Sequence, residues 1–404
     1  MNSLEIFSGA GGLAKGLALE GFDHSAFIEF DKHACESLYE NYDKEKVFYG
    51  DVRNYDFDIL NDIDLVAGGP PCQPFSLGGK HKANKDNRDM FPYAIKAIEQ
   101  LSPKAFIFEN VKGLLRASFR DYFEYITLRL SYPGYPAVND NWREHLVSLR
   151  NLDSRTYKGK QYKVKYMLLN AADFGVPQCR ERVVIVGVRS DIKGDFHFPK
   201  PTHSEDKLIW DKFITGEYWD RHKITNKLRE KPRGYILNKI NRVNSSYGLW
   251  KPELLPWNTI RDALSDVPDP RKKHNIPDHI YRDGAKCYAG HTGSDIDWPS
   301  KTVKAGGHGV PGGENMMRYL DGSVRYFTVY EAKIIQTFPR DYIIKGSWGE
   351  ALRQIGNAVP VLLARKIGDE LFKVLSEKEK GNRVKSYASK AISKQNKIYE
   401  LAAC

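Results

Sequence analysis

The chain of 404 residues lacks the features that mark secreted and membrane proteins. None of its apolar runs approaches the ~18 residues of a membrane helix. Residues 1–7 have no basic start followed by an apolar stretch, as a signal peptide would. There are only five cysteines and no C-x-x-C pair, which argues against a zinc site and favours reduced thiols. We therefore expect a cytoplasmic protein without a metal, in which one cysteine is a candidate nucleophile.

Acidic residues are the minority among the charged ones. The 62 lysines and arginines outnumber 51 aspartates and glutamates, so the net charge is +11, which favours a polyanionic partner such as nucleic acid. The excess is densest in residues 207–242, where ten basic residues stand against four acidic ones among scattered tryptophans and tyrosines. A solvated insertion with exposed lysines would have the same composition, so this segment does not decide the matter alone.

Short apolar runs alternate with helix-like stretches through the first ~190 residues. Such alternation predicts an α/β fold with a doubly wound, mostly parallel sheet. The runs are rich in valine, isoleucine and phenylalanine, as strands covered on both faces are. Expected strands are 4–7, 26–30, 47–49, 64–67, 105–108 and 183–188, and expected helices are 12–20, 32–42, 93–100 and 119–130.

The composition and the pattern of the sequence change after about residue 190. Prolines and glycines punctuate the chain and no helical period of useful length is evident, which predicts an irregular, loop-rich insertion. Helical patterns return at 329–336 and 357–375. We predict one domain from residues 1–190 plus 346–375, an inserted second domain at 191–345, and a basic C-terminal tail at 376–404.

A glycine-rich segment, Phe-Ser-Gly-Ala-Gly-Gly at residues 7–12, lies between the first strand and the first helix. Glycines there let backbone N–H groups approach a ligand at a helix N-terminus. Glu29 ends the next strand 20 residues after Gly9, where nucleotide-binding α/β folds place an acid for ribose hydroxyls. Asp51 follows the third strand. The ligand is a dinucleotide or S-adenosylmethionine, and the incomplete G-x-G-x-x-G disfavours a pyrophosphate; a tight turn with surface acids is the plain alternative.

A cysteine on a rigid loop is the strongest chemical feature. Residues 68–76, Gly-Gly-Pro-Pro-Cys-Gln-Pro-Phe-Ser, follow an expected strand, and the two prolines restrict how Cys72 is presented. Active sites of such folds lie at this carboxyl edge of the sheet. Cys72 is therefore the candidate nucleophile rather than an inert packed thiol.

Charged residues end two further strands of the same sheet. Glu109 closes the strand beside that of Cys72, so both are expected on one rim, where a carboxylic acid could protonate a ring nitrogen; the alternative is a helix-capping acid. Arg180 and Arg182 alternate onto one side and could hold a carboxylate, a phosphate or a base. A structural salt bridge is as good an interpretation for Arg182. Cys179 points the other way and is discounted as a nucleophile.

These segments, in this order, resemble the DNA (cytosine-5) methyltransferase family. The similarity covers about residues 4–188 and 300–368, while the basic middle matches nothing useful. The combination of Pro-Cys-Gln-Pro-Phe-Ser at 71–76, Glu-Asn-Val at 109–111 and Gln-x-Arg-x-Arg at 178–182 is highly specific. The segments at 7–12, 325–339 and 354–360 also match.

The resemblance implies a site-specific enzyme that transfers a methyl group from S-adenosylmethionine to C5 of cytosine in duplex DNA, after flipping the base. Cys72 would attack C6, Glu109 would bind the ring at N3, and Arg180 would assist at the flipped base, with Arg182 in the same catalytic set. It further implies that residues 1–190 plus 346–375 are the catalytic and cofactor-binding domain, that 191–345 is the target-recognition domain, and that the enzyme is functionally paired with a restriction endonuclease. Nothing in the sequence demands more than a monomer. The expected cofactor-binding residues are Phe7, Ser8, Gly9, Ala10, Gly11, Gly12, Glu29, Phe30, Asp51, Val52, Pro71, Met90, Asn357 and Ala358.

Three other interpretations stay open on the sequence. The same enzyme class could act on RNA, although the long insertion of ~130 residues favours DNA. A nicotinamide-dependent oxidoreductase could use the glycine turn, but it leaves Cys72 and the 178–182 segment without a role. A DNA-binding module without activity is hard to reconcile with intact Cys72, Glu109 and Arg180.

Overall fold

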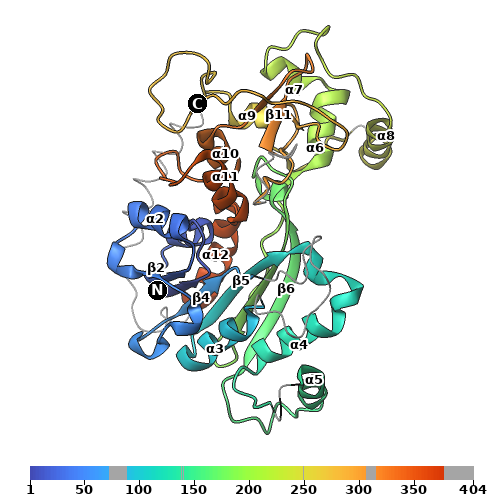
Figure 1. The fold of residues 1–404 in the computed structure, drawn as a ribbon. Coiled ribbons are helices and arrows are strands. Elements are labelled where there is room, and N and C mark those ends of the chain that lie inside the picture. The colour runs from blue at the N-terminus through green and yellow to red at the C-terminus, as the bar shows by residue number, and fades with distance from the viewer. Residues whose placement is uncertain (72–88, 138, 140, 249, 306–314, 377–404) are drawn as a thin grey trace, which may run out of the picture.

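The computed structural model describes residues 1–71, 89–137, 139, 141–248, 250–305 and 315–376. A seven-stranded sheet in the order β3-β2-β1-β4-β5-β7-β6 forms its larger part (Figure 1). The first five strands in this order are parallel, β7 runs antiparallel to them, and the edge strand β6 runs antiparallel to β7. The strands are β1 Asn2–Ile6, β2 Asp23–Glu29, β3 Val47–Tyr49, β4 Leu65–Gly68, β5 Ala105–Val111, β6 Tyr162–Asn170 and β7 Glu181–Arg189.

Helices cover both faces of this sheet, which confirms the doubly wound α/β fold. The apolar side chains of α3 and α4 form one core with Leu4 and Ile6 of β1. Leu13 and Leu17 of α1 form the opposite core with α12 and with Leu65 of β4. The covering helices are α1 Gly12–Ala18, α2 Lys32–Asn41, α3 Phe91–Leu101, α4 Arg120–Ser131 and α12 Val361–Ser376, and α5 Trp142–Arg150 packs on α4.

Two predictions in this part were incomplete or wrong. The strand β6 and the helix α5 were not expected, because the edge strand has exposed lysine and apolar residues in no clear alternation. The helix expected at 357–375 is α12, which begins later than predicted, at Val361, and the helix before it, α11 Trp348–Asn357, was not expected. Pro360 lies between them, and a proline disfavours helical geometry at the residue before it.

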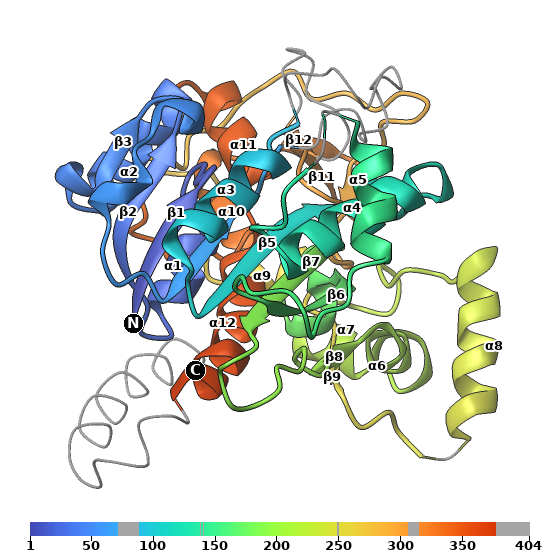
Figure 2. The same cartoon turned by 90° about the horizontal axis from the view of Figure 1, so that it is seen from below.

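The second part of the molecule is more helical than expected. Three helices lie between residues 205 and 247, with a π-helical turn at Trp210–Ile214, so the prediction of a purely irregular segment was wrong. The longest helix, α8, buries only Ile236 and Val243 and therefore shows a weak apolar stripe. Figure 2 shows it at the outer edge of the molecule. The elements are β8 His203–Ser204, α6 Glu205–Ile209, α7 Glu217–Arg221, α8 Tyr235–Tyr247, β9 Leu255–Pro256 and α9 Ile260–Ala263.

The chain then returns toward the sheet. Ser300 forms a parallel bridge with Gln178, just before β7. Farther on, Phe327 and Ala332 share a core with Ala10 of the glycine-rich segment. The division at residue 345 stays a prediction. The elements of this stretch are β10 Ser294–Asp295, β11 Met316–Arg318, β12 Val324–Tyr326 and α10 Val329–Ile335.

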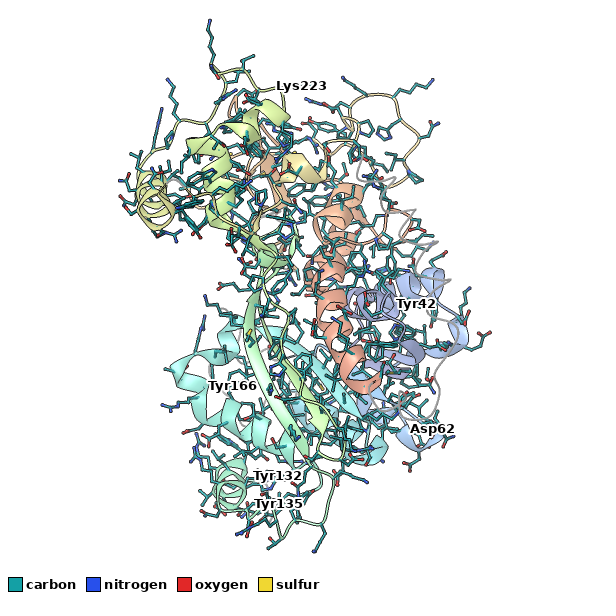
Figure 3. All side chains as sticks on the ribbon, turned by 180° about the vertical axis from the view of Figure 1, so that it is seen from behind. Tyr42, Asp62, Tyr132, Tyr135, Tyr166 and Lys223 are labelled. Carbon is teal, nitrogen blue, oxygen red and sulfur yellow. The ribbon has the colours of Figure 1, made fainter. Side chains whose placement is uncertain are left out.

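Figure 3 shows how far the two parts extend: Lys223 lies in the second part, and Tyr132 and Tyr135 lie at the opposite end, below the sheet. None of the helices in the described ranges combines the length and the apolar character that crossing a membrane requires.

Candidate functional site

The glycine-rich segment forms a tight turn between β1 and α1. Gly9 and Gly11 have φ values of +53° and +79°, a conformation that favours glycine. The Gly9 N–H donates to Oε2 of Glu29 over 2.7 Å, so the turn is tied to the end of β2. A Cβ on Gly11 would lie 2.5 Å from the hydroxyl of Tyr342, which itself donates to the Ala10 carbonyl over 2.7 Å. The turn is thus held on two sides.

The start of α1 also touches the link between α11 and α12. A Cβ on Gly12 would lie 2.4 Å from the Val359 carbonyl oxygen and 2.9 Å from the Cβ of Ala358. Gly16, one turn further along α1, approaches Ala364 of α12 as closely. The structure therefore brings the first and last of the expected cofactor segments into direct contact, as the prediction that the last helix packs beside the glycine turn requires.

The two expected acids differ in their surroundings. Glu29 is buried, and its carboxylate accepts the N–H groups of Gly9, Phe30 and Asp31; burial raises its pKa. Asp51 pairs with Arg53 at 2.5 Å, and this hydrogen bond lowers the pKa of Asp51. The side chain of Phe30 is 68% exposed and Val52 is buried in the core. Their expected roles toward a cofactor stay predictions.

The carboxyl ends of β4 and β5 lie side by side, as the sequence predicted. The side-chain amide of Asn110 donates to the Pro70 carbonyl over 3.0 Å, which joins the Pro-Pro segment to the end of β5. The Pro71 carbonyl accepts the N–H of Met90 at the start of α3. Cys72 follows Pro71 directly but lies outside the described residues.

Glu109 and Arg182 form an ion pair at this rim. Nε of Arg182 lies 2.6 Å from Oε1 of Glu109, and the carboxylate is largely buried. The contact is not aligned as a hydrogen bond, so Oε1 keeps its capacity to accept a donor. Gly69, in the loop after β4, lies close by, since a Cβ there would be 3.6 Å from Oε2 of Glu109. A buried carboxylate held by an arginine beside a glycine is suited to bind a flat ring that carries donors.

Arg180 has a different environment from Arg182. Its guanidinium is buried and donates to the Gly356 carbonyl over 2.8 Å, at the carboxyl end of α11. Burial lowers its pKa, as does the charge of Arg182, while Glu109 raises it. Its Nε and Nη1 groups have no partner among the described residues. Arg180 therefore caps a helix end with part of its guanidinium and leaves the rest unpaired near the rim.

The other thiols near the sheet are poor nucleophiles. Burial, together with the charges of Glu205 and Asp173, raises the pKa of Cys179 to about 12. Burial likewise raises the pKa of Cys35 to about 12. Since the thiolate is the reactive form, both are inert at neutral pH. This agrees with the decision to discount Cys179.

Two buried residues near the site were missed. Tyr342 holds the Ala10 carbonyl, and Gln336 bonds to Gln178 and to two carbonyls between α11 and α12. Both lie on segments whose amino-acid pattern shows burial but not partners. One sequence has no signal for which distant carbonyl a buried amide or hydroxyl meets.

Comparison with known proteins decides which family these features belong to. The model of the family described as C-5 cytosine-specific DNA methylase matches residues 1–140 and 140–373. The chain belongs to this family. It is a DNA cytosine-5 methyltransferase, which answers the oxidoreductase alternative.

Relatives of this methyltransferase cover most of its length. It is 32% identical to the Type II methyltransferase M.PspPI of a Psychrobacter species, over 92% of this chain and 79% of the relative. It is 30% identical to the Type II methyltransferase M.NgoMIV of Neisseria gonorrhoeae, over 93% and 98%. A methyltransferase encoded within an Escherichia coli prophage shares the fold, with a TM-score of 0.57 and 18% identity over 93% of this chain and 99% of the other.

Proposed function

We propose that this methyltransferase modifies cytosines through a covalent intermediate on Cys72. C5 of cytosine is a weak nucleophile, and addition of a thiolate at C6 makes it an enamine carbon. The Asn110 side chain, next to Glu109 in β5, donates to the Pro70 carbonyl, two residues before Cys72. This contact supports the proposal that Cys72 acts beside the carboxylate of Glu109. The observation on which the proposal rests is the buried Glu109–Arg182 pair at this rim.

Glu109 is proposed to bind N3 and the exocyclic amine of the cytosine ring. Negative charge appears on the ring at N3 as C6 is attacked, and the carboxyl group of Glu109 would stabilise it by donating a proton there, while its other oxygen accepts from the exocyclic amine. Arg182 holds the carboxylate in place, and Arg180, with two unpaired N–H groups, is proposed to assist at the same base. The proton on C5 leaves to a base in the last step, and the thiolate is released.

The expected cofactor residues fit S-adenosylmethionine, which supplies the methyl group when bound. A Cβ on Gly9 would meet nothing within 4 Å, so there is open space above the turn. The carboxylates of Glu29 and Asp51 end adjacent strands and could accept hydrogen bonds from hydroxyl and amino groups. We propose that Asn357 and Ala358 form the opposite wall, because Ala358 touches Gly12.

Duplex DNA must deliver its target base into this pocket, since C5 and C6 are inaccessible inside the stack. We propose that residues 191–345 read the target sequence, with lysines and arginines of this stretch binding phosphates. The relatives are named Type II methyltransferases, which supports a role in restriction-modification. We propose that the enzyme is a cytoplasmic monomer that protects DNA against a paired restriction endonuclease.

The test is transfer of tritium from labelled S-adenosylmethionine to duplex DNA, followed by identification of the labelled base. We expect label at cytosine C5 with the wild type and none with Cys72→Ala. Failure of the wild type to label cytosine in bulk unmethylated DNA, or full transfer by Cys72→Ala, would reject the proposal. Competition with transfer RNA tests the RNA alternative in the same assay.

A further inference from the structure

A buried amide connects the proposed cofactor wall to the proposed catalytic rim. Gln336 lies just after α10 with its side chain fully buried, as does Gln178 just before β7. The proposed mechanism uses neither residue. Their side chains nevertheless form a hydrogen bond with each other, between the two halves of the site.

The first arm of Gln336 reaches the link between α11 and α12. Its side-chain N–H₂ group donates to the Ile355 carbonyl over 2.6 Å and to the Ala358 carbonyl over 3.0 Å. Its backbone carbonyl also accepts the N–H of Val361, over 3.1 Å. The last carbonyls of a helix have no partners within it. Gln336 therefore supplies hydrogen-bond partners for the backbone groups at the break between α11 and α12, next to the proposed Asn357–Ala358 wall.

The second arm of Gln336 reaches the 178–182 segment. Its side-chain oxygen accepts the amide N–H of Gln178 over 2.9 Å. The oxygen of the Gln178 amide accepts the Val303 N–H over 3.2 Å, so this amide is oriented from both ends. Two residues further along the chain is Arg180, and four residues further is Arg182, the partner of Glu109.

We propose that Gln336 is a positioning residue that holds the Asn357–Ala358 wall in register with the catalytic rim. The inference rests on the proposed function of both places. The amide is suited to this task because its N–H₂ group only donates and its oxygen only accepts. The carbonyls between α11 and α12 need a donor, and the N–H₂ group of Gln178 needs an acceptor. Leucine fills similar space without either group, so the substitution isolates the hydrogen bonds.

The experiment measures cofactor affinity and turnover separately. Equilibrium dialysis gives the Kd for S-adenosylmethionine, and single-turnover methylation of bulk unmethylated duplex DNA at saturating cofactor gives the rate. In Gln336→Leu we expect the cofactor Kd to rise about 10- to 100-fold, because two buried carbonyls lose their donor. In Gln178→Leu we expect a Kd within about twofold of wild type and a rate about tenfold lower.

A pH profile adds a signature that general destabilisation would not produce. In Gln336→Glu the new carboxyl group can donate to the carbonyls only while it is protonated. We therefore expect its cofactor Kd, relative to wild type, to improve as the pH is lowered from 8 to 6. This variant also keeps the inference testable if Gln336→Leu does not fold.

Gln354 provides the matched control. It is an equally buried amide on α11, but it accepts from the Ser37 hydroxyl and donates to the Lys345 carbonyl, away from both arms. Gln354→Leu should cost similar thermal stability and keep the cofactor Kd within about twofold. Equal Kd values for Gln336→Leu and Gln354→Leu, or a Gln178→Leu variant that loses cofactor affinity rather than rate, would overturn the inference. A wild type that binds no S-adenosylmethionine would instead reject the proposed function.

Discussion

The sheet and the 205–298 region are built on different principles. Between the sheet and the helices α3 and α4 lies a large core of apolar side chains, such as Leu4, Val66 and Phe106. In the second part, the buried side chains include Lys212, Asp297 and Tyr218 together with Trp219. The first kind of core depends on burying enough area, and the second depends on matching individual donors to individual acceptors.

Lys212 shows what such matching involves. Its ammonium lies 2.6 Å from Glu230, donates to the Asp297 carbonyl over 2.9 Å, and sits 3.9 Å from the centre of the Trp298 ring. Burial lowers the pKa of Lys212, and the charge of Glu230 counteracts this. We therefore expect the core beside the sheet to tolerate the replacement of one apolar side chain by another. In the second part, removal of one polar partner should lower the free energy of unfolding strongly.

The largest expected effect is on the chemistry that the sheet supports. Glu109→Gln should lower the single-turnover rate about 10²- to 10³-fold, because the ring loses its stabilising acid at N3. Glu181→Gln is the matched control, since it removes an exposed ion pair with Lys112 at the same rim. Its rate should stay within about twofold. Equal losses in the two variants would show that rim charge, not ring binding, is what matters.

Lys212→Met tests whether the two parts are independent. We expect a loss of about 2–3 kcal/mol in the unfolding free energy of the second part, less than for a fully enclosed pair because Glu230 is partly exposed. DNA binding should fall while the cofactor Kd is unchanged. Lys239→Met, which breaks a more exposed pair with Glu205, should cost less than about 1 kcal/mol. Urea denaturation and limited proteolysis measure both, and a cofactor Kd that rises with Lys212→Met contradicts the comparison.

Gly12→Ala tests the close packing on the sheet side. The added Cβ would meet the Val359 backbone at 2.4 Å, so we expect a loss of about 1–3 kcal/mol and weaker cofactor binding. Gly349→Ala, where the same atom meets nothing within 4 Å, should instead stabilise α11 by about 0.5 kcal/mol. Thermal unfolding and equilibrium dialysis distinguish the two; a neutral Gly12→Ala would mean that the turn can shift.

The last prediction concerns Glu5, an acid that is buried in β1. Burial raises the pKa of Glu5 from its ordinary value near 4.5 to about 8. Between these values the unfolded chain ionises while the folded chain keeps the proton, so the folded state loses about 1.4 kcal/mol per pH unit as the pH rises. Glu5→Gln should lack this loss and be the more stable protein at pH 7.5.

His24 lies 3.8 Å from Glu5, and burial lowers its pKa to about 4. Between about pH 4 and 6.5 the unfolded chain takes up a proton on His24 that the folded chain does not, so this contribution lowers stability as the pH falls. It overlaps only the lower part of the Glu5 window, and the difference between pH 6.5 and 7.5 therefore reports on Glu5. Urea denaturation at pH 5.5, 6.5 and 7.5 measures the difference. Parallel stability profiles for the two proteins would mean that Glu5 is ionised when folded.

Much of the sheet and its rim could be predicted because strands covered on both faces have dense apolar sequences. The adjacency of Gly9 with Glu29, and of the β4 and β5 ends, followed from the order of those strands. The edge strand β6 and the helix α8 could not be predicted, since each buries few residues. The role of Gln336 was not predictable either, because its partners are backbone carbonyls that any sequence would supply.

The central claim is that Cys72 bonds to C6 of a cytosine in duplex DNA. The most direct measurement uses duplex DNA with 5-fluorocytosine in one strand, because fluorine at C5 prevents the final proton loss. With S-adenosylmethionine present, the account predicts a protein–DNA complex that survives denaturing electrophoresis, formed by the wild type and absent in Cys72→Ala. A wild type that methylates ordinary DNA yet forms no such complex, or a complex of equal yield with Cys72→Ala, would contradict it.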